Sequence, residues 1–179
     1  VRDMDDGEGL AGSDTIVFNG KLKYSNLILL YQAQGAEIRT AEGLLKGREL
    51  NYVQKAMISA GIVQSAYNAP AAALILTWLP EQKPNPTKDE IKEVLSGIFI
   101  RDAGYEHYYL AVKLATELRD YGEYKSEIAP SFRPKLNIIG KPCDKIDGAS
   151  LVSGEKVFVE DKVPQDAWCL HVLRSPFSH

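Results

Sequence analysis

Hydrophobic and polar residues alternate near the start of the chain, as they do in strands. In residues 15–24, TIVFNGKLKY, the alternation runs on either side of Asn19 and Gly20, a dipeptide typical of the type I′ turn of a hairpin. The apolar stretch NLILLYQAQG then stops at Gly35, and IRTAEG indicates a further strand. Because so little sheet cannot bury a face by itself, the pattern predicts at least one more hairpin before these elements, and hence a truncated domain.

Residues 48–119 follow the 3.6-residue period of amphipathic helices instead. A first helix is indicated by apolar residues that share one face: Leu50, Val53, Ala56, Met57 and Ala60. A second helix is capped by Asn68 or Ala69, and Pro70 stands near its first position, where a missing N–H does no harm. This helix contains the run AAALILTWLP, which we expect to be buried.

Two more helices complete the predicted helical part. Thr87 and Glu90 are spaced as a capping box, and the helix that they start ends at Gly97. A fourth amphipathic helix is expected from about Tyr105 to Arg119. Four helices with short connections predict a compact bundle. Residues 120–137 have the character of a linker, and residues 138–179 begin a unit that we expect to be rich in strands.

Composition excludes several classes of protein. The chain has 179 residues, of which 45% are hydrophobic and 25% charged, as in an ordinary globular protein. Its net charge of -3, without a basic stripe, excludes nucleic acid as a partner. The longest apolar run falls far short of the roughly 20 residues that span a bilayer, so no membrane is expected. The two cysteines, Cys143 and Cys169, have no paired spacing, which favours a reducing compartment, the cytoplasm by default.

Three familiar kinds of site are weakly indicated or absent. The segment GEGLAG matches the dinucleotide pattern G-x-G-x-x-G, but acidic residues precede it and a strand, not a helix, follows. The same segment read as a calcium loop from Asp3 places Gly7 and Glu8 at the fifth and sixth positions, so the register fails. The chain has three histidines, His107, His171 and His179, but no Ser or Cys stands in a recognisable nucleophile motif such as G-x-S-x-G. A solvated acidic loop is therefore expected at the start of the chain.

Small and polar residues recur at the spacing of iron–sulfur ligands. Asp6, Ala11 and Asp14 reproduce the plant-type spacing C-x4-C-x2-C without its cysteines, and Asn26 follows after the hairpin. Ser65 and Asn68 repeat the x2 spacing. Both regions therefore keep the spacing of iron–sulfur ligands without the cysteines, which raises the question of which group these positions bind.

With these motifs the sequence resembles the iron–sulfur portion of the molybdenum hydroxylases, the xanthine dehydrogenase and aldehyde oxidase family. The segments that carry the resemblance are DDGEGLAGSDTIVFNGKLKYSNL, QAQGAEIRTAEGL, GIVQSAYNAPA and NPTKDEIKEVLSGIFIRDAGY. Residues 138–179 resemble the opening of the large molybdenum-binding domain. The resemblance implies an α+β fold with a truncated ferredoxin-like β-grasp domain (1–45), a four-helix [2Fe-2S]-binding-like bundle (46–120), a linker (121–137) and the start of a molybdopterin-binding domain (138–179).

The sequence departs from the family at every cluster ligand. The resemblance places the eight cysteine ligands at positions that carry no cysteine here: Asp6, Ala11, Asp14, Asn26, Ser65, Asn68, Ile100 and Asp102. Because cysteine thiolates hold these clusters, we expect both [2Fe-2S] clusters to be absent and the two domains to be structural. We expect the replacing side chains to fill the emptied sites, Ile100 and Ala11 by volume and the polar residues by hydrogen bonds. Two carboxylates, Asp6 and Asp14, with Ala and Asn, make a poor cage for another metal.

The resemblance also implies a role for the chain in a larger enzyme. That enzyme would be an oxidoreductase of the xanthine dehydrogenase type, hydroxylating purines or related heterocycles with water as the oxygen source. Its catalytic residues would lie beyond His179, and its molybdenum–pterin cofactor would contact Gln64 and Asp102. The expected partners are the remaining molybdenum-binding domain and a flavin or iron–sulfur subunit. The alternative is a structural or docking module that recruits a partner carrying the electron route.

Overall fold

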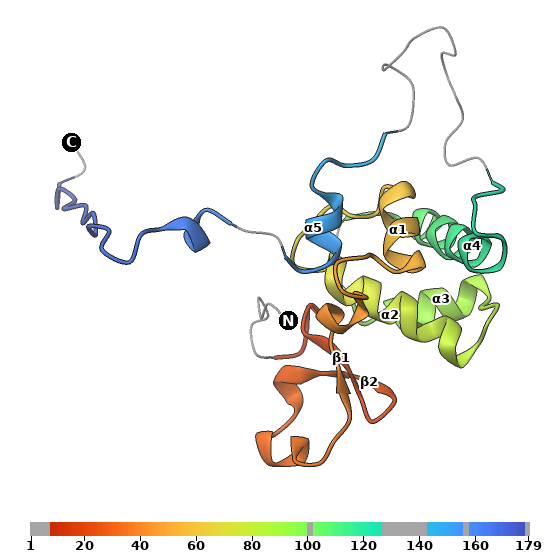
Figure 1. Ribbon diagram of the computed structural model, residues 1–179. Coiled ribbons are helices and arrows are strands. Elements are labelled where there is room, and N and C mark those ends of the chain that lie inside the picture. The colour runs from red at the N-terminus through yellow and green to blue at the C-terminus, as the bar shows by residue number, and fades with distance from the viewer. Residues whose placement is uncertain (1–7, 100–101, 127–142, 156–157, 178–179) are drawn as a thin grey trace, which may run out of the picture.

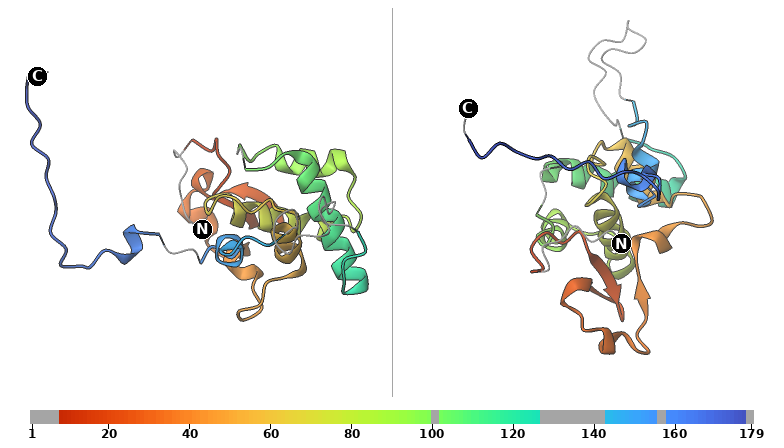
Figure 2. Two further views of the ribbon diagram at one scale, coloured as in Figure 1. Left: turned by 90° about the horizontal axis from the view of Figure 1, so that it is seen from above. Right: turned by 90° about the vertical axis from the view of Figure 1, so that its left-hand side faces the viewer.

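The structure is a computed structural model that describes residues 8–99, 102–126, 143–155 and 158–177. A small antiparallel sheet lies on one side of a group of helices, and a C-terminal segment extends away from both (Figure 1). Two further views show the same separation of the body from the C-terminal segment (Figure 2). Within the described ranges, no helix combines the length and the apolar content needed to cross a membrane.

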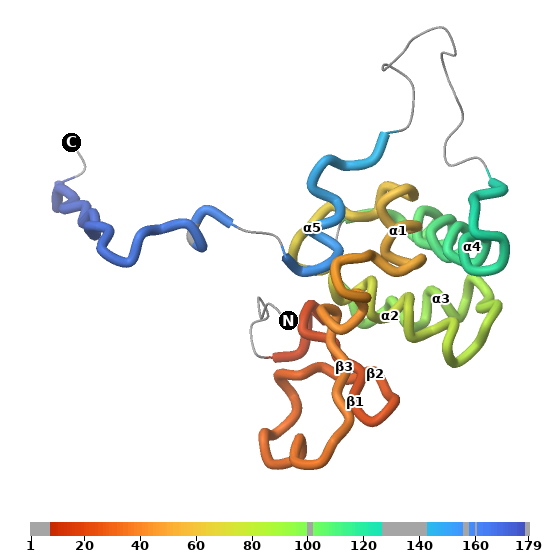
Figure 3. The backbone as a smooth tube through the Cα atoms, viewed as in Figure 1, coloured from red at the N-terminus to blue at the C-terminus, as the bar shows by residue number. Residues whose placement is uncertain are grey.

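The sheet has three strands in the order β2-β1-β3, with both neighbours antiparallel to β1. The strands are β1 (Thr15–Phe18), β2 (Lys21–Tyr24) and β3 (Ile38–Arg39), and their path is clearest in the backbone tube of Figure 3. Asn19 and Gly20 join β1 to β2 with φ angles of 48° and 77°. Positive φ at both central positions is what a type I′ turn requires. The predicted hairpin is therefore confirmed.

The third predicted strand is shorter than the sequence indicates. Only Ile38–Arg39 pair with β1, and residues Ala41–Leu44 turn into a 3₁₀ helix. Ala41 and Leu44 are both buried, and a 3₁₀ turn brings residues three apart onto the same side. Burial of these two side chains therefore accounts for the early end of the strand. The stretch between β2 and β3 also contains short 3₁₀ helices, Ser25–Leu27 and Leu30–Ala33.

Four α-helices form where the periodicity predicts them. They are α1 (Tyr52–Ser59), α2 (Ala69–Gln82), α3 (Lys88–Leu95) and α4 (Tyr105–Tyr121). The run AAALILTWLP lies in α2 and is almost wholly buried, because α2 has β1 on one side and α1 and α3 on others. A helix enclosed in this way has no solvent-facing polar stripe. The centre of the core contains Met57, Leu74 and Leu114, none of which exposes any measurable surface.

Capping residues fix where two of the helices begin. Thr87 and Glu90 form the predicted capping box of α3, with Glu90 Oε2 accepting from the Thr87 N–H at 2.7 Å. Asn51 and Gln54 form a second capping box at α1, where Asn51 Oδ1 accepts from the Gln54 N–H at 2.8 Å and Gln54 Oε1 accepts from the Asn51 N–H at 2.9 Å. Each box satisfies two backbone donors that a helix start otherwise leaves open.

The C-terminal region differs from the sequence prediction. Its first described element is a short helix, α5 (Gly148–Val152), which packs on α1 and α2. The described residues of 143–155 and 158–177 contain no strand, so the prediction of a strand-rich unit is wrong for them. A strand needs a neighbour to take up its backbone hydrogen bonds, and residues 164–177 run alone, away from the body (Figure 1). The assignment of 138–179 to a molybdenum-binding domain stays a prediction.

Candidate functional site

The first group of proposed ligand positions is centred on a buried carboxylate. Asp14 has 0% of its surface exposed. Its Oδ2 atom accepts hydrogen bonds from the Asn26 N–H at 2.8 Å and from the Ser25 hydroxyl at 3.2 Å. The backbone carbonyl of Asp14 also accepts from the Ser25 N–H. Asp14 therefore ties the start of β1 to the segment after β2, the two stretches that a first cluster would bridge.

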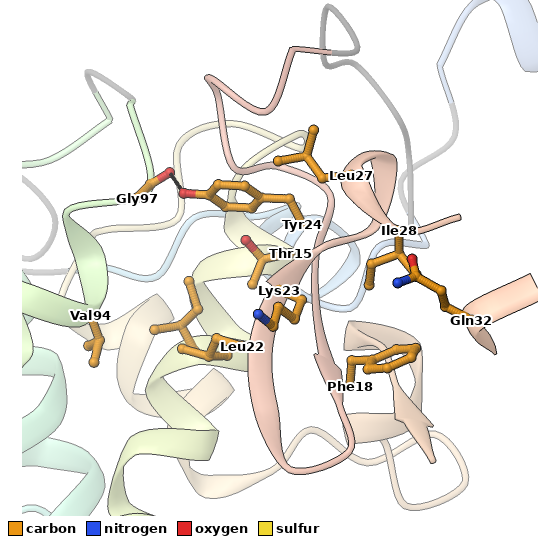
Figure 4. Close-up of a pocket in the computed structure, with 11 residues that line it drawn as sticks. Thr15, Phe18, Leu22, Lys23, Tyr24, Leu27, Ile28, Gln32, Val94 and Gly97 are labelled. Atoms are coloured by element: carbon orange, nitrogen blue, oxygen red, sulfur yellow. Dashed lines mark hydrogen bonds between the residues drawn. The ribbon is translucent and has the colours of Figure 1, made fainter. Parts of the chain in front are cut away.

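The loop before Asp14 lies against the segment that leads to the second group. The Ala11 carbonyl accepts from the Phe99 N–H at 3.2 Å. Gly12 has a φ of 72°, and a Cβ at this position would lie 2.2 Å from the Gly97 carbonyl oxygen, so only glycine fits. The same carbonyl accepts from the Tyr24 hydroxyl at 2.8 Å (Figure 4). The two groups of proposed ligand positions are thus neighbours in the folded chain.

The second group is brought together by a hydrogen bond across 37 residues. The Ser65 N–H donates to Asp102 Oδ2 at 3.2 Å, and the Ser65 hydroxyl accepts from the Tyr67 N–H at 3.1 Å. Asn68 stands at the N-cap of α2 as predicted, but its side chain forms no capping hydrogen bond. Its Oδ1 atom is buried and has no hydrogen-bond partner among the described residues. A hydrogen bond therefore joins Ser65 to Asp102, whereas the hydrogen bond expected of the replacing side chain is missing at the Asn68 oxygen among the described residues.

These residues do not fit an iron–sulfur cluster. The described positions of both groups offer carboxylate, amide and hydroxyl oxygens and one methyl group, but no thiolate or imidazole. Asp14 and Asp102 already use an oxygen on a backbone N–H. Asp6 and Ile100 lie outside the described residues. Within the described part of the chain, no three His, Cys, Asp or Glu side chains gather as they would around a metal ion.

Burial makes the second group electrostatically unusual. It raises the pKa of the Asp102 carboxyl above its usual range, and the hydrogen bond from Ser65 opposes that rise. Burial, with a smaller contribution from the Asp102 charge, also raises the pKa of Tyr108 to about 12. Burial disfavours the charged form of a carboxyl group, so the half-buried Asp102 favours the protonated form more than a solvated carboxyl group does.

Gln64 lies next to this group but on the surface. Its side chain is exposed, and its Nε2 donates to the Gly61 carbonyl at 2.7 Å. Asp102 bonds to the backbone of the following residue, Ser65. The structure therefore brings Gln64 and Asp102, the two residues predicted to face a pterin, to the same loop.

A separate apolar cavity of about 530 Å³ opens between the sheet and the helices. Figure 4 shows Phe18, Leu22 and Ile28 along it, with Lys23 and Gln32 among its polar side chains. Thr15, which follows Asp14, also lines it. None of the proposed ligand positions does, so the cavity is distinct from both groups.

Sequence reasoning missed two contacts that shape this region. Gln54 is fully buried, and its Nε2 donates to the Val152 carbonyl at 3.2 Å, which joins α1 to α5. The spacing Asn51-x-x-Gln54, a capping-box pattern, could have indicated the bond between Asn51 and Gln54 but not the contact with Val152. Tyr67 stacks on Phe158 with ring centroids 5.5 Å apart. No local pattern predicts this pair, because its members are far apart in the sequence.

Comparison with known proteins places the chain in a family. Residues 40–113 match the family model of the [2Fe-2S] binding domain. The chain is 34% identical over 110 residues to the nicotinate dehydrogenase small FeS subunit of Eubacterium barkeri, covering 62% of this chain and 70% of that protein. The chain belongs to the iron–sulfur family of the molybdenum hydroxylases. Residues 1–142 contain no cysteine, since the two cysteines of the chain are Cys143 and Cys169.

Further relatives of this chain agree in sequence and fold. It is 47% identical over 179 residues to the probable hypoxanthine oxidase XdhD of Escherichia coli (strain K12), covering 100% of this chain and 19% of that protein. The chain thus spans about a fifth of the length of that relative. The aldehyde oxidoreductase of Desulfovibrio desulfuricans ATCC 27774 superimposes with a TM-score of 0.75 at 23% identity, covering 89% of this chain and 18% of that one. The mixed α and β fold of the family is therefore shown.

Proposed function

We propose that this chain is part of a larger molybdenum hydroxylase of the xanthine dehydrogenase type, in which the iron–sulfur domains have lost their clusters and serve a structural role. The observation that carries the proposal is the hydrogen bonding of Asp14 and Asp102. Both residues stand at proposed ligand positions, and each accepts a hydrogen bond from a backbone N–H of the protein itself. We assign 1–45 to a truncated ferredoxin-like β-grasp domain, 46–120 to a four-helix bundle and 121–137 to a linker. The following residues, 138–179, would begin the molybdopterin-binding domain, and the cytoplasm is the proposed location.

The substrate class rests on sequence similarity along the whole chain. The relative that matches over 179 residues is named a probable hypoxanthine oxidase. We therefore propose purines or related heterocycles as substrates of the full polypeptide. When bound, the molybdenum–pterin cofactor would supply the hydroxylation chemistry, with residues outside this chain completing the active site.

Two residues of this chain are proposed to contact the pterin. Gln64 is exposed, and one polar end of its side chain, Nε2, is held by Gly61. Asp102 keeps an oxygen beyond the one bonded to Ser65, and it can accept from an amino group of a pterin. Their placement around the Ser65 backbone supports a shared role for the two side chains.

The rival proposal is a non-catalytic structural or docking module, whose own polypeptide contains no active site. Such a module would recruit a flavin or iron–sulfur protein that carries the electron route. The large apolar cavity between the sheet and the helices favours this alternative, because apolar concave surfaces are typical of binding sites.

Metal analysis tests the structural role directly. We expect the purified 179-residue chain to contain neither iron nor acid-labile sulfide in stoichiometric amounts and to lack visible absorbance. The control is the variant Ser65→Cys, Asn68→Cys, Ile100→Cys, Asp102→Cys, reconstituted in parallel with iron and sulfide, which shows whether the scaffold can still bind a cluster. Stoichiometric iron and sulfide in the unaltered chain would overturn the proposal.

A second measurement separates the two functions. The longer natural polypeptide is purified, its molybdenum is quantified, and the oxidation of hypoxanthine is followed by absorbance. Molybdenum together with substrate oxidation supports the hydroxylase. A folded polypeptide with neither supports the docking module.

A further inference from the structure

The C-terminal segment leaves the body of the protein at Phe158. This side chain is half-buried and packs against the core, whereas Val159 next to it is 80% exposed. From residue 161 to residue 177 every described side chain is exposed. Phe158 is therefore the last described residue that packs on the hydrophobic core, and the exposed segment that follows extends away from the body (Figure 1).

The anchor is an aromatic stack with the loop of the second ligand group. The rings of Tyr67 and Phe158 lie 5.5 Å apart between centroids and only 5° from parallel. Local hydrogen bonds orient Phe158, since its N–H donates to Asp161 Oδ2 at 2.8 Å and its carbonyl accepts from the Asp161 N–H at 3.2 Å. Phe158 thus begins a compact turn whose ring is held on one side by Tyr67.

Tyr67 is in turn held by residues at the emptied ligand positions. Its N–H donates to the Ser65 hydroxyl at 3.1 Å, and the Ser65 N–H donates to Asp102 Oδ2 at 3.2 Å. The Ser65 carbonyl also accepts from the Ala69 N–H, which fixes the loop to the start of α2. A continuous series of contacts therefore runs from Asp102 through Ser65 and Tyr67 to Phe158.

We infer that the loop of residues 63–68 anchors the exit of the C-terminal segment through the Tyr67–Phe158 stack, with Ser65 and Asp102 as positioning residues. A cluster would hold this loop in place in the family, whereas here Ser65 and Asp102 hold it by hydrogen bonds. The loop in turn fixes the direction in which the chain leaves the body. This role goes beyond the proposed function and does not depend on molybdenum or on the substrate.

Hydrogen exchange of the 179-residue chain tests the anchor at the amides of Phe158, Asp161 and Lys162, all of which donate hydrogen bonds in the turn. An aromatic pair is worth about 0.5–1.5 kcal/mol beyond its buried area. Tyr67→Ala and Phe158→Ala are therefore expected to raise exchange at these amides by about two- to twelvefold. Tyr67→Phe keeps the ring and is expected to leave exchange unchanged. The matched control is Tyr31→Ala, at a tyrosine that is 73% exposed.

The positioning residues have a separate readout. Ser65→Ala and Asp102→Ala are expected to raise exchange at Asp161 and Lys162 as well, although neither residue touches them, while Asp102→Asn restores protection because its amide oxygen still accepts from Ser65. Thermal unfolding of each variant identifies those that lose the whole fold. Exchange at residues 158–162 that stays at the native level in Tyr67→Ala, or in a folded Ser65→Ala, overturns the inference. Iron content, measured on the same samples, tests the proposed function independently.

Discussion

The Oδ2 atom of Asp14 accepts a hydrogen bond from the Asn26 N–H at 2.8 Å, and both residues stand where the family resemblance places cysteine ligands. Asp14→Ala leaves this N–H without its partner, and a buried unsatisfied group costs about 1–3 kcal/mol. Asp14→Asn keeps one carbonyl oxygen and is expected to lose less. Urea denaturation followed by circular dichroism gives the free energy of unfolding. The exposed Asp144→Ala is the control, and an equal loss in both alanine variants would contradict the assigned role.

Asp102 gives a prediction about pH. Its pKa is raised in the folded chain, mainly by burial, so the folded state holds this proton more tightly than the unfolded state does. The contribution of Asp102 to stability is therefore complete below the unfolded pKa of about 3.9 and declines as the pH rises through the raised pKa. Asp102→Asn removes this decline while keeping an acceptor for Ser65. We expect its free energy of unfolding to exceed that of Asp102→Ala at every pH and to lack the native decline that begins as the pH rises above about 3.9.

How far the sequence predicts this fold depends on the range of the interactions involved. The hairpin follows from Asn19 and Gly20, because few residues adopt positive φ at two successive positions. The start of α3 follows from Thr87 and Glu90, which satisfy each other's backbone. By contrast, the early end of β3 depends on burial of Leu44 against the helices, which no local pattern contains. The same holds for the C-terminal segment, whose alternation predicts a strand but whose described residues have no neighbouring strand to pair with.

The candidate site divides in the same way. The family resemblance identifies Ser65 and Asp102 as ligand positions, but the bond between them needs the loops to meet in space. The family resemblance also does not predict that Asn68 Oδ1 stays without a hydrogen-bond partner among the described residues. Spacing thus locates the site, whereas the repacking after cysteine loss depends on side-chain geometry.

The polar side chain of Gln54 is predicted to stabilise the fold, because it is buried and makes two hydrogen bonds. It is fully buried, donates to the Val152 carbonyl at 3.2 Å and accepts from the Asn51 N–H at 2.9 Å. Gln54→Leu is similar in size but leaves both groups unpaired, at about 1–3 kcal/mol each. Urea denaturation is expected to show this loss, together with faster hydrogen exchange in α5. The control is Gln32→Leu on the exposed stretch between β2 and β3, and a native exchange rate in α5 of Gln54→Leu would show that the contact does not hold that helix.

Glu90 gives a prediction at acid pH. Hydrogen bonds from the Lys83 ammonium, from the Thr87 N–H and from the Thr87 hydroxyl lower its pKa to about 2. A lowered pKa means that the unfolded chain takes up the proton first, so this contribution to stability is present above about pH 4.3 and is lost as the pH falls through about 2. Glu90→Gln is expected to remove that acid dependence and to weaken the start of α3. Carboxyl chemical shifts recorded by NMR across pH 1.5–6 measure the pKa directly. In Thr87→Ala, which removes the hydroxyl, the midpoint should move upward towards the ordinary value for glutamate, and a midpoint near 4.3 in the native chain would show that the capping box does not hold Glu90 charged.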